Sequence, residues 1–326
     1  MKAAYINQLG APENILFGDL PKPSIGDTDV LVEVSYAAVN NDDLLVRSGR
    51  FPIAKPAPYI IGRTMCGVVR ATGRRTTRFM IGERVWSDLL GIHGRQGVCA
   101  QYVSADETLL NRLPKTLDEK KTVAFVHSGL IVCLGMLTYG KLGAGESIFI
   151  HGASGNIGSA AIQVAKTMGS TVIATAGTQE KVEWCRMLGA AYVYNFTKPD
   201  YSKDILKVIP EGVDVYWDLT NEPNLERALL FMRPGGRILL MSNLDLHPAL
   251  PLKALCWKDC TVKGFNSLNA NPEEYNSYGD VICQMLEKGL VKVHIARTFP
   301  LQEVGEAHRL LESANPPQSG KILISV

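Results

Sequence analysis

Glycines near the middle of the chain stand at a spacing suited to phosphate binding. An apolar run, Ser147–His151, leads into Gly152-Ala153-Ser154-Gly155-Asn156-Ile157-Gly158, and residues with helical apolar periodicity follow. A strand, a glycine-rich turn and a helix in this order are typical of dinucleotide-binding folds, here with Ala153 in the first glycine position. Gly155 would let the backbone approach a pyrophosphate, and the helix N-terminus would offer free N–H groups to it. Gly158 would let the helix pack close to the strand. The alternative interpretation is a tight structural turn.

The end of the next predicted strand indicates which dinucleotide is bound. NAD sites usually place Asp or Glu about 20 residues after the first glycine, on the ribose 2′-hydroxyl. This chain has Ala174-Thr175-Ala176-Gly177-Thr178 there, and Lys181 follows. Without the carboxylate, Thr178 and Lys181 are suited to bind a 2′-phosphate. The pattern favours NADP over NAD, although Lys181 also fits a solvated position on a helix.

These residues require an α/β fold to position them. From residue 147 on, predicted strands alternate with helices, which predicts a doubly wound parallel sheet. Before residue 115 the chain reads as short strands and turns, typical of a small barrel or sandwich. The strands predicted for the second part are Ser147–His151, 171–175, Tyr192–Asn195, Val213–Asp218, 237–241 and Thr261–Phe265. A helix is expected at 272–288. A last strand, 321–326, is expected to rejoin the first domain.

Composition excludes several classes of protein. The chain has 326 residues, of which 46% are hydrophobic and 20% charged, so intrinsic disorder is excluded. The formal charge is only +2, so neither a nucleic acid nor a membrane is expected as a partner. No apolar run is long enough to predict a transmembrane helix. Seven scattered cysteines are best explained as reduced thiols, and a cytoplasmic location is expected.

Taken together, the motifs resemble one known family over nearly the whole chain. They include AAVNNDDLLVRSGRFP at 37–52, FMIGERVW at 79–86, HGASGNIGSAAIQVAKTMG at 151–169 and RPGGRIL at 233–239. The chain resembles the zinc-independent, zeta-crystallin-like quinone oxidoreductases of the medium-chain dehydrogenase/reductase superfamily. The resemblance implies a GroES-like β-barrel catalytic domain (1–121 and 266–326), a Rossmann NADP-binding domain (122–265) and NADPH as cofactor.

The resemblance also assigns residues to the cofactor. Ser154, Gly155, Asn156 and Ile157 should touch the pyrophosphate, and Gly177 and Lys181 should lie by the 2′-phosphate. Further cofactor contacts are expected from three segments, namely from Asn224, from Met241, Ser242 and Asn243, and from Phe265, Asn266 and Ser267. Asn40 matches an asparagine found beside the nicotinamide and substrate in the family. The alternative for Asn40 is a capping amide at a strand end.

No metal site is expected. Zinc-dependent relatives have a cysteine near the position of Asn40 and a Gly-His-Glu triplet where this chain has Gly62-Arg63-Thr64. Arginine stays protonated and cannot ligate zinc. Without a metal, hydride addition to an activated acceptor, a quinone or an α,β-unsaturated carbonyl, fits better than alcohol oxidation. Arg63 facing a cleft would bind a carboxylate, a phosphate or an enolate oxygen, and the alternative is a surface or interdomain salt bridge.

Other functions stay open at this point. Within the enzyme class, an enoyl reductase of a biosynthetic pathway is the main rival. Changed active-site positions and six arginines within 63–84 also permit a weakly catalytic NADPH-binding protein with a structural or RNA-binding role. A homodimer is expected, with Thr261–Phe265 at a sheet edge pairing with its copy.

Overall fold

The structure is a computed structural model that describes residues 1–51, 54–220, 222–241, 247–313 and 320–326. The chain forms two compact units. Unit 1 comprises Met1–His127, Asn271–Gly289 and Val293–Val326, and unit 2 comprises Ser128–Ala270 and Leu290–Lys292. The ranges predicted from the sequence, 1–121 with 266–326 and 122–265, differ at both boundaries. The first boundary differs because one continuous helix, α2 (Glu119–Cys133), runs through it.

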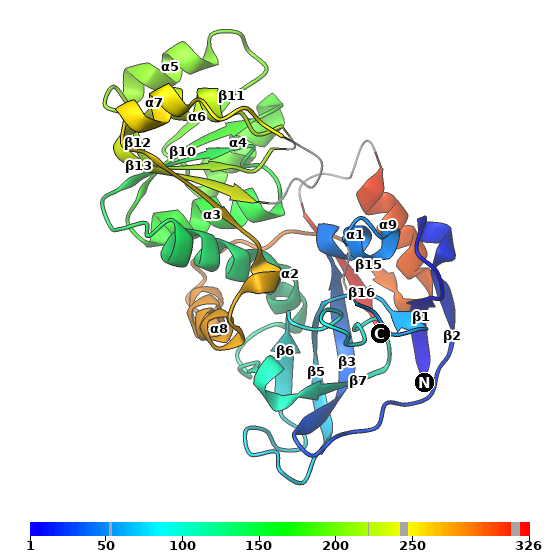
Figure 1. Cartoon of the computed structure of the whole chain (residues 1–326). Helices are drawn as coiled ribbons and strands as arrows, with labels where there is room; N and C mark the ends of the chain where they lie inside the picture. Colours follow the sequence, from blue (N-terminus) through cyan, green and yellow to red (C-terminus); the bar gives the residue numbers. More distant parts are fainter. Residues whose placement is uncertain (52–53, 221, 242–246, 314–319) are drawn as a thin grey trace. The chain divides into compact units, whose positions relative to one another are not determined.

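Unit 2 contains a six-stranded sheet in which all neighbouring strands are parallel. Its order is β11-β10-β9-β12-β13-β14. Figure 1 draws this sheet in green to yellow. The strands are β9 (Ser147–His151), β10 (Thr171–Ala176), β11 (Tyr192–Asn195), β12 (Val213–Asp218), β13 (Met232–Met241) and β14 (Thr261–Phe265). The predicted doubly wound parallel sheet is therefore confirmed. The strand order reverses between β9 and β12, which is where ligands bind in such sheets.

Helices cover both faces of this sheet. α3 packs on α4 against β9 and β10, whereas α6 packs against β12 and β13, as can be followed in Figure 1. The helices are α3 (Asn156–Thr167), α4 (Gln179–Leu188), α5 (Tyr201–Val208), α6 (Leu225–Phe231) and α7 (Leu252–Trp257), with short turns η3 (Leu134–Tyr139) and η4 (Ser267–Asn269). Phe149 stacks on Tyr216 and on Phe231, each with ring centroids 5.0 Å apart, at the centre of the core.

Unit 1 is built mainly from antiparallel strands. Its larger sheet has the order β15-β16-β3-β5-β6-β8, with β7 also paired to β3, and a smaller sheet has the order β2-β1-β4. The strands are β1 (Lys2–Ile6), β2 (Leu16–Asp19), β3 (Asp29–Val39), β4 (Tyr59–Ile60), β5 (Thr64–Thr72), β6 (Arg84–Ser87), β7 (Tyr102–Asp106), β8 (Asn111–Arg112), β15 (Ile295–Pro300) and β16 (Lys321–Ser325). β16 pairs with β3, so the last strand rejoins the first domain as expected.

Few helices accompany these strands. They are α1 (Asn41–Ser48), α8 (Pro272–Glu287), α9 (Val304–Glu312) and the start of α2, with short turns η1 (Pro12–Asn14), η2 (Glu107–Leu109) and η5 (Leu301–Glu303). The segment Glu119–Tyr139, which joins α2 to η3, is apolar and long enough to cross a membrane, but 83% of its apolar window is buried inside the protein. It is therefore accounted for as a core helix.

Candidate functional site

The glycine-rich turn of unit 2 forms an open helix end. β9 ends at His151, the chain turns through Gly152 at φ +78°, and Gly155 is the N-cap of α3. Gly155 and Asn156 are exposed, and Ser154 and Ile157 are half-buried. The first N–H groups of a helix have no partner within the helix, so they are available to a phosphate here. The structure thus brings these predicted residues together at the carboxyl end of β9.

Gly155 and Gly158 differ in their surroundings. A Cβ atom on Gly155 would have no other atom within 4 Å, whereas one on Gly158 would lie 2.5 Å from the carbonyl oxygen of Ala153. Gly158 therefore serves the close packing of α3 on the turn. Gly155 instead leaves open space in front of the helix end.

The carboxyl end of β10 lies next in the sheet. Gly177 follows this strand, and Thr178 is the N-cap of α4, where its hydroxyl oxygen accepts the Lys181 backbone N–H at 3.3 Å. The hydroxyl proton of Thr178 can still be donated. Thr178 and Lys181 are exposed, so both side chains are accessible to an anion.

The other predicted cofactor contacts are already engaged in local structure. The side-chain oxygen of Asn224 caps α6 by accepting the Arg227 N–H at 2.8 Å, which leaves its amide N–H groups free to donate. Asn266 caps η4 by accepting the Leu268 N–H at 3.0 Å, and Ser267 is buried. Phe265 is buried against Tyr139 and Trp217, with centroids 4.8 and 5.9 Å away.

The end of β13 is described only in part. Met241 is the last residue of β13 and is half-buried. Ser242 and Asn243 lie outside the described residues.

In unit 1, Asn40 is buried and forms hydrogen bonds through both its backbone and its side chain. It follows β3 and is the N-cap of α1, where its backbone N–H donates to Asp43 Oδ2 at 2.7 Å. Its side-chain Nδ2 donates to Thr64 Oγ1 at 2.9 Å, and its Oδ1 accepts from Lys321 Nζ. Only 2% of Asn40 is exposed. The capping position foreseen as the alternative is present, within a larger polar network.

Asp88, directly after β6, is the centre of that network. Its carboxylate accepts from Thr64 Oγ1 and, at 2.7 Å, from the Tyr275 hydroxyl, and His127 Nδ1 lies 3.0 Å from Oδ1. Burial alone would raise the pKa of Asp88, but His127 and Arg63 hold it well below its ordinary value. Asp88 is therefore a fixed, buried negative charge.

Arg63 points into this network. Its Nε donates to the Asp88 backbone carbonyl at 2.6 Å, one terminal nitrogen donates to Asp42 Oδ2 at 3.1 Å, and the other lies 3.5 Å from Asp88 Oδ2. Arg63 does form ion pairs, with Asp42 and Asp88, but only 2% of it is exposed and both partners lie in the same unit, so the expected surface or interdomain salt bridge is not what is found. A direct contact between Arg63 and the acceptor stays a prediction without support from this geometry.

The donor set does not fit a zinc ion. The positions that zinc-dependent relatives use hold Asn40 and Gly62-Arg63-Thr64, and a permanently protonated guanidinium is not a ligand. Among residues 1–51, 54–220, 222–241, 247–313 and 320–326, no group of three His, Cys, Asp or Glu side chains is placed to hold a metal.

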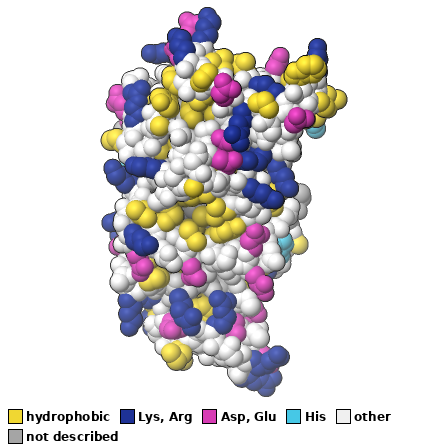
Figure 2. Space-filling view, turned by 90° about the vertical axis from the view of Figure 1, so that its left-hand side faces the viewer, with side chains coloured by type: hydrophobic (Ala, Val, Ile, Leu, Met, Phe, Trp, Pro, Cys, Tyr) yellow, Lys and Arg dark blue, Asp and Glu magenta, His cyan; other side chains and the backbone are white. Residues whose placement is uncertain are grey.

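The arginines within 63–84 do not form one basic surface. Arg70 pairs with Glu33, Arg74 with Asp27 and Arg84 with Glu119. Figure 2 shows Lys and Arg interspersed with Asp and Glu over the face in view. With Arg63, four of the six arginines are thus paired with carboxylates, which weakens the attraction of this segment for a polyanion such as RNA.

Sequence reasoning missed Asp88, Tyr275 and Lys321 as members of the network. Asp88 could have been noticed in the sequence, because it is an acidic residue inside the apolar run VWSDLLGI. No local pattern marks Lys321 or Tyr275, since their partners lie 281 and 187 residues away in the chain.

The parallel sheet, with its open glycine turn at the reversal of strand order, defines a Rossmann-type dinucleotide-binding protein. A family model described as "Alcohol dehydrogenase GroES-like domain" matches residues 26–115, and one described as "Zinc-binding dehydrogenase" matches residues 156–282. The quinone oxidoreductase of Sus scrofa is 30% identical over 313 residues, covering 94% of this chain and 93% of that protein.

Solved structures agree with this class. A structure described as an NAD-dependent alcohol dehydrogenase is 28% identical, with a TM-score of 0.89 and full coverage of both chains. An Escherichia coli quinone oxidoreductase complexed with NADPH shares the fold, at 22% identity, a TM-score of 0.88 and full coverage of both chains.

The chain belongs to the quinone oxidoreductase branch of the medium-chain dehydrogenase/reductase superfamily. It is accordingly an oxidoreductase, and the predicted GroES-like and Rossmann architecture is confirmed. The predicted nicotinamide dinucleotide cofactor is confirmed as well, since the Rossmann domain of this superfamily binds NAD(P).

Proposed function

We propose that this protein is an NADPH-dependent, zinc-independent oxidoreductase that reduces a quinone or an α,β-unsaturated carbonyl compound. The observation that carries the proposal is the pairing of an open helix N-terminus with a β10 end that has Thr178 and Lys181 in place of a carboxylate. The quinone oxidoreductase relatives support the acceptor class.

The cofactor preference follows from charge. A carboxylate after β10 would accept the ribose hydroxyl of NAD and repel a 2′-phosphate, and this chain has none within 174–178. The exposed ammonium of Lys181 and the hydroxyl of Thr178 instead supply donors for a phosphate. NADPH bound at this turn would supply a hydride, and the residues of the turn hold its phosphates.

Replacing Lys181 tests this preference. Lys181→Ala is expected to raise the KM for NADPH about tenfold, since a charge-assisted hydrogen bond contributes roughly 1.5 kcal/mol, and to leave the KM for NADH unchanged. Steady-state kinetics with both cofactors measures it. Lys203→Ala, which removes an exposed lysine on α5, is the matched control. Equal effects of Lys181→Ala on both cofactors would refute the assignment.

In unit 1, side chains rather than a metal ion are proposed to position the acceptor. Asn40 is proposed to contact the acceptor or the ribose, and Arg63 to act as a positioning residue that stabilises Asp88. Because Arg63 occupies a zinc ligand's place in the sequence, dialysis against a chelator is expected to leave the activity unchanged. The proton that completes the reduction comes from solvent.

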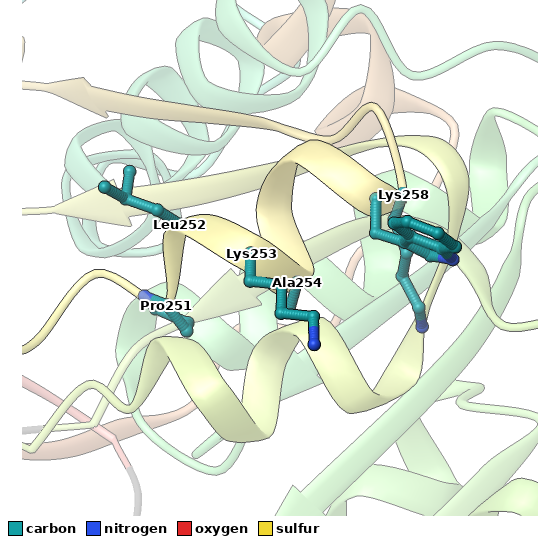
Figure 3. Close-up of a pocket in the computed structure, with 6 residues that line it drawn as sticks. Pro251, Leu252, Lys253, Ala254 and Lys258 are labelled. Carbon is teal, nitrogen blue, oxygen red and sulfur yellow. The ribbon is translucent and has the colours of Figure 1, made fainter.

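We also propose a homodimer formed through β14 and α7. β14 is an edge strand paired only with β13 among the described strands, and such an edge can pair with its copy about a two-fold axis. Beside it, α7 buries none of its residues and lines an open hollow of about 770 Å³, shown in Figure 3. Trp257 is 85% exposed there. Leu252, which lines the same hollow, is 62% exposed, and neighbouring exposed apolar side chains of this kind can mark an interaction surface.

A cytoplasmic location is proposed with it. Every cysteine is free, and all but Cys256 are buried. Reduced thiols of this kind are typical of intracellular proteins.

A further inference from the structure

A directed chain of hydrogen bonds runs through Asn40 inside unit 1. It starts at Lys321 on β16, passes Asn40 after β3 and Thr64 at the start of β5, and ends on Asp88 after β6. All four residues are buried, with exposed fractions of 3% or less. Four separate segments of the chain are thus joined around one side-chain amide.

The two ends of this chain fix the direction of every bond in it. A protonated lysine can only donate, and an ionised carboxylate can only accept. Lys321 therefore donates to Asn40 Oδ1, Asn40 Nδ2 donates to Thr64, and Thr64 donates to Asp88. The flipped Asn40 amide would set its N–H groups against the ammonium and would turn Thr64 away from Asp88. Only one orientation of the amide satisfies all the groups.

This network leaves one side-chain N–H of Asn40 available for a further hydrogen bond. An asparagine amide has two N–H donors, of which Asn40 uses one toward Thr64. Its oxygen accepts from Lys321 and, in the capping box of α1, from the Asp43 backbone N–H. The ammonium on Oδ1 draws electron density from the amide, which strengthens its remaining N–H as a donor. The acceptor end is equally fixed, because Arg63, His127 and Tyr275 all contact Asp88.

We infer that Lys321 is a positioning residue that locks the Asn40 amide in one orientation and so decides which edge of Asn40 meets a ligand. Its consequence for turnover rests on the proposed function, in which Asn40 contacts the acceptor or the ribose. The orientation of the Asn40 amide does not depend on the proposed function.

The amide can be observed without any turnover. In protein labelled with ¹⁵N-asparagine, the Asn40 side-chain NH₂ signals are assigned by their loss in Asn40→Asp. Lys321→Met, which keeps an unbranched side chain but no donor, is expected to shift these signals. Lys321→Arg, which keeps a cationic donor, should return them toward the wild-type position. Lys115→Met, at an exposed lysine of the same unit, is the control and should leave them unchanged.

An Asn40 signal that is the same in Lys321→Met as in wild type would overturn the inference. If Lys321→Met does not fold, Thr64→Val removes the acceptor of Asn40 Nδ2 with little change of shape. It should shift the same signals, and an unshifted signal again contradicts the inference.

Kinetics then tests the consequence for the reaction. Lys321→Met is expected to lower kcat/KM for the acceptor about tenfold, the size expected for one lost hydrogen bond, with Lys321→Arg recovering most of it. The Kd for NADPH should stay unchanged where Asn40 contacts the acceptor and should rise where Asn40 contacts the ribose, so this Kd distinguishes the two contacts. A shifted Asn40 signal with unchanged kcat/KM would overturn the role in the reaction. No turnover by the wild type would instead contradict the proposed function and leave the NMR result standing.

Discussion

Gly155 and Gly158 lie three residues apart but meet different surroundings, so the same substitution separates binding from folding. Gly155→Ala adds a methyl group into open space and should leave the free energy of unfolding nearly unchanged. The methyl group would stand where the pyrophosphate approaches, so NADPH affinity should fall at least about tenfold.

Gly158→Ala should behave in the opposite way. Its methyl group would lie within 2.6 Å of three backbone atoms of Ala153 and would destabilise unit 2 by about 1–3 kcal/mol. Urea unfolding and titration with NADPH measure the two effects. A Gly155→Ala variant that binds NADPH like the wild type would contradict the placement of the phosphates.

Asp43 provides a pH signature of the buried network. Burial raises the pKa of Asp43 to about 6, although the hydrogen bond from the Asn40 backbone and the charges of His127 and Lys321 oppose the rise. The folded protein thus holds this proton more tightly than the unfolded chain. The free energy of unfolding should therefore fall as the pH rises from about 4 to about 6, by about 1–3 kcal/mol.

Asp43→Asn isolates this effect, because its amide oxygen still accepts the Asn40 N–H but does not titrate. Urea unfolding at several pH values should show the wild type losing stability relative to Asp43→Asn over that range. Asp19→Asn is the control. A hydrogen bond from Lys2 lowers the pKa of this exposed carboxyl, so its contribution is lost as the pH falls. A pH-independent difference between wild type and Asp43→Asn would contradict the burial of an ionisable Asp43.

Candidate site residues can be proposed from the sequence where they depend on local chain geometry. The turn 152–158 and Thr178 with Lys181 are each complete within one segment, and the structure places them at neighbouring strand ends. Asn40 and Arg63 were also candidates, but their hydrogen-bond partners could not be predicted. Hydrogen bonds to Lys321 and Tyr275 depend on tertiary packing of distant segments, which no local pattern reports.

At the scale of elements, α7 and β14 carry the prediction about assembly. Trp257→Glu places a charge on the proposed interface and should convert a dimer, of twice 35.6 kDa, into a monomer. Light scattering measures the mass. Met187→Glu, at a 60% exposed methionine on α4, is the matched control and should leave the dimer intact. A wild type that is monomeric at micromolar concentration would contradict the proposed interface.

Most elements were predictable because their patterns are local. The predicted strands at 147–151, 192–195, 213–218 and 261–265 have the observed bounds. β13 begins earlier than the predicted 237, at Met232, because Pro234 and two glycines disguise its first half. The start of α2 is harder to place from the sequence, because Thr116 and Asp118 are both residue types that cap helices. In the structure, Asp118 accepts the Lys121 backbone N–H at 2.8 Å.

At the scale of the whole molecule, the order of predicted strands and helices indicated a strand-rich domain and a parallel α/β domain in one chain. It also indicated that the last strand rejoins the first domain. It did not predict the course of α2, which belongs to both units and moves the boundary to residues 127 and 128. A helix is recognised from local periodicity, whereas a domain boundary depends on which neighbours its faces contact.

The central claim is that the enzyme moves a hydride from NADPH to an activated acceptor. Turnover of an enone with NADPH that carries deuterium at the transferred position tests it most directly, with mass spectrometry of the reduced product and a saturated aldehyde as control. One deuterium on the β-carbon of the enone product and no reaction with the aldehyde are expected. An enone product without deuterium, or no NADPH consumption with either quinones or enones, would contradict it.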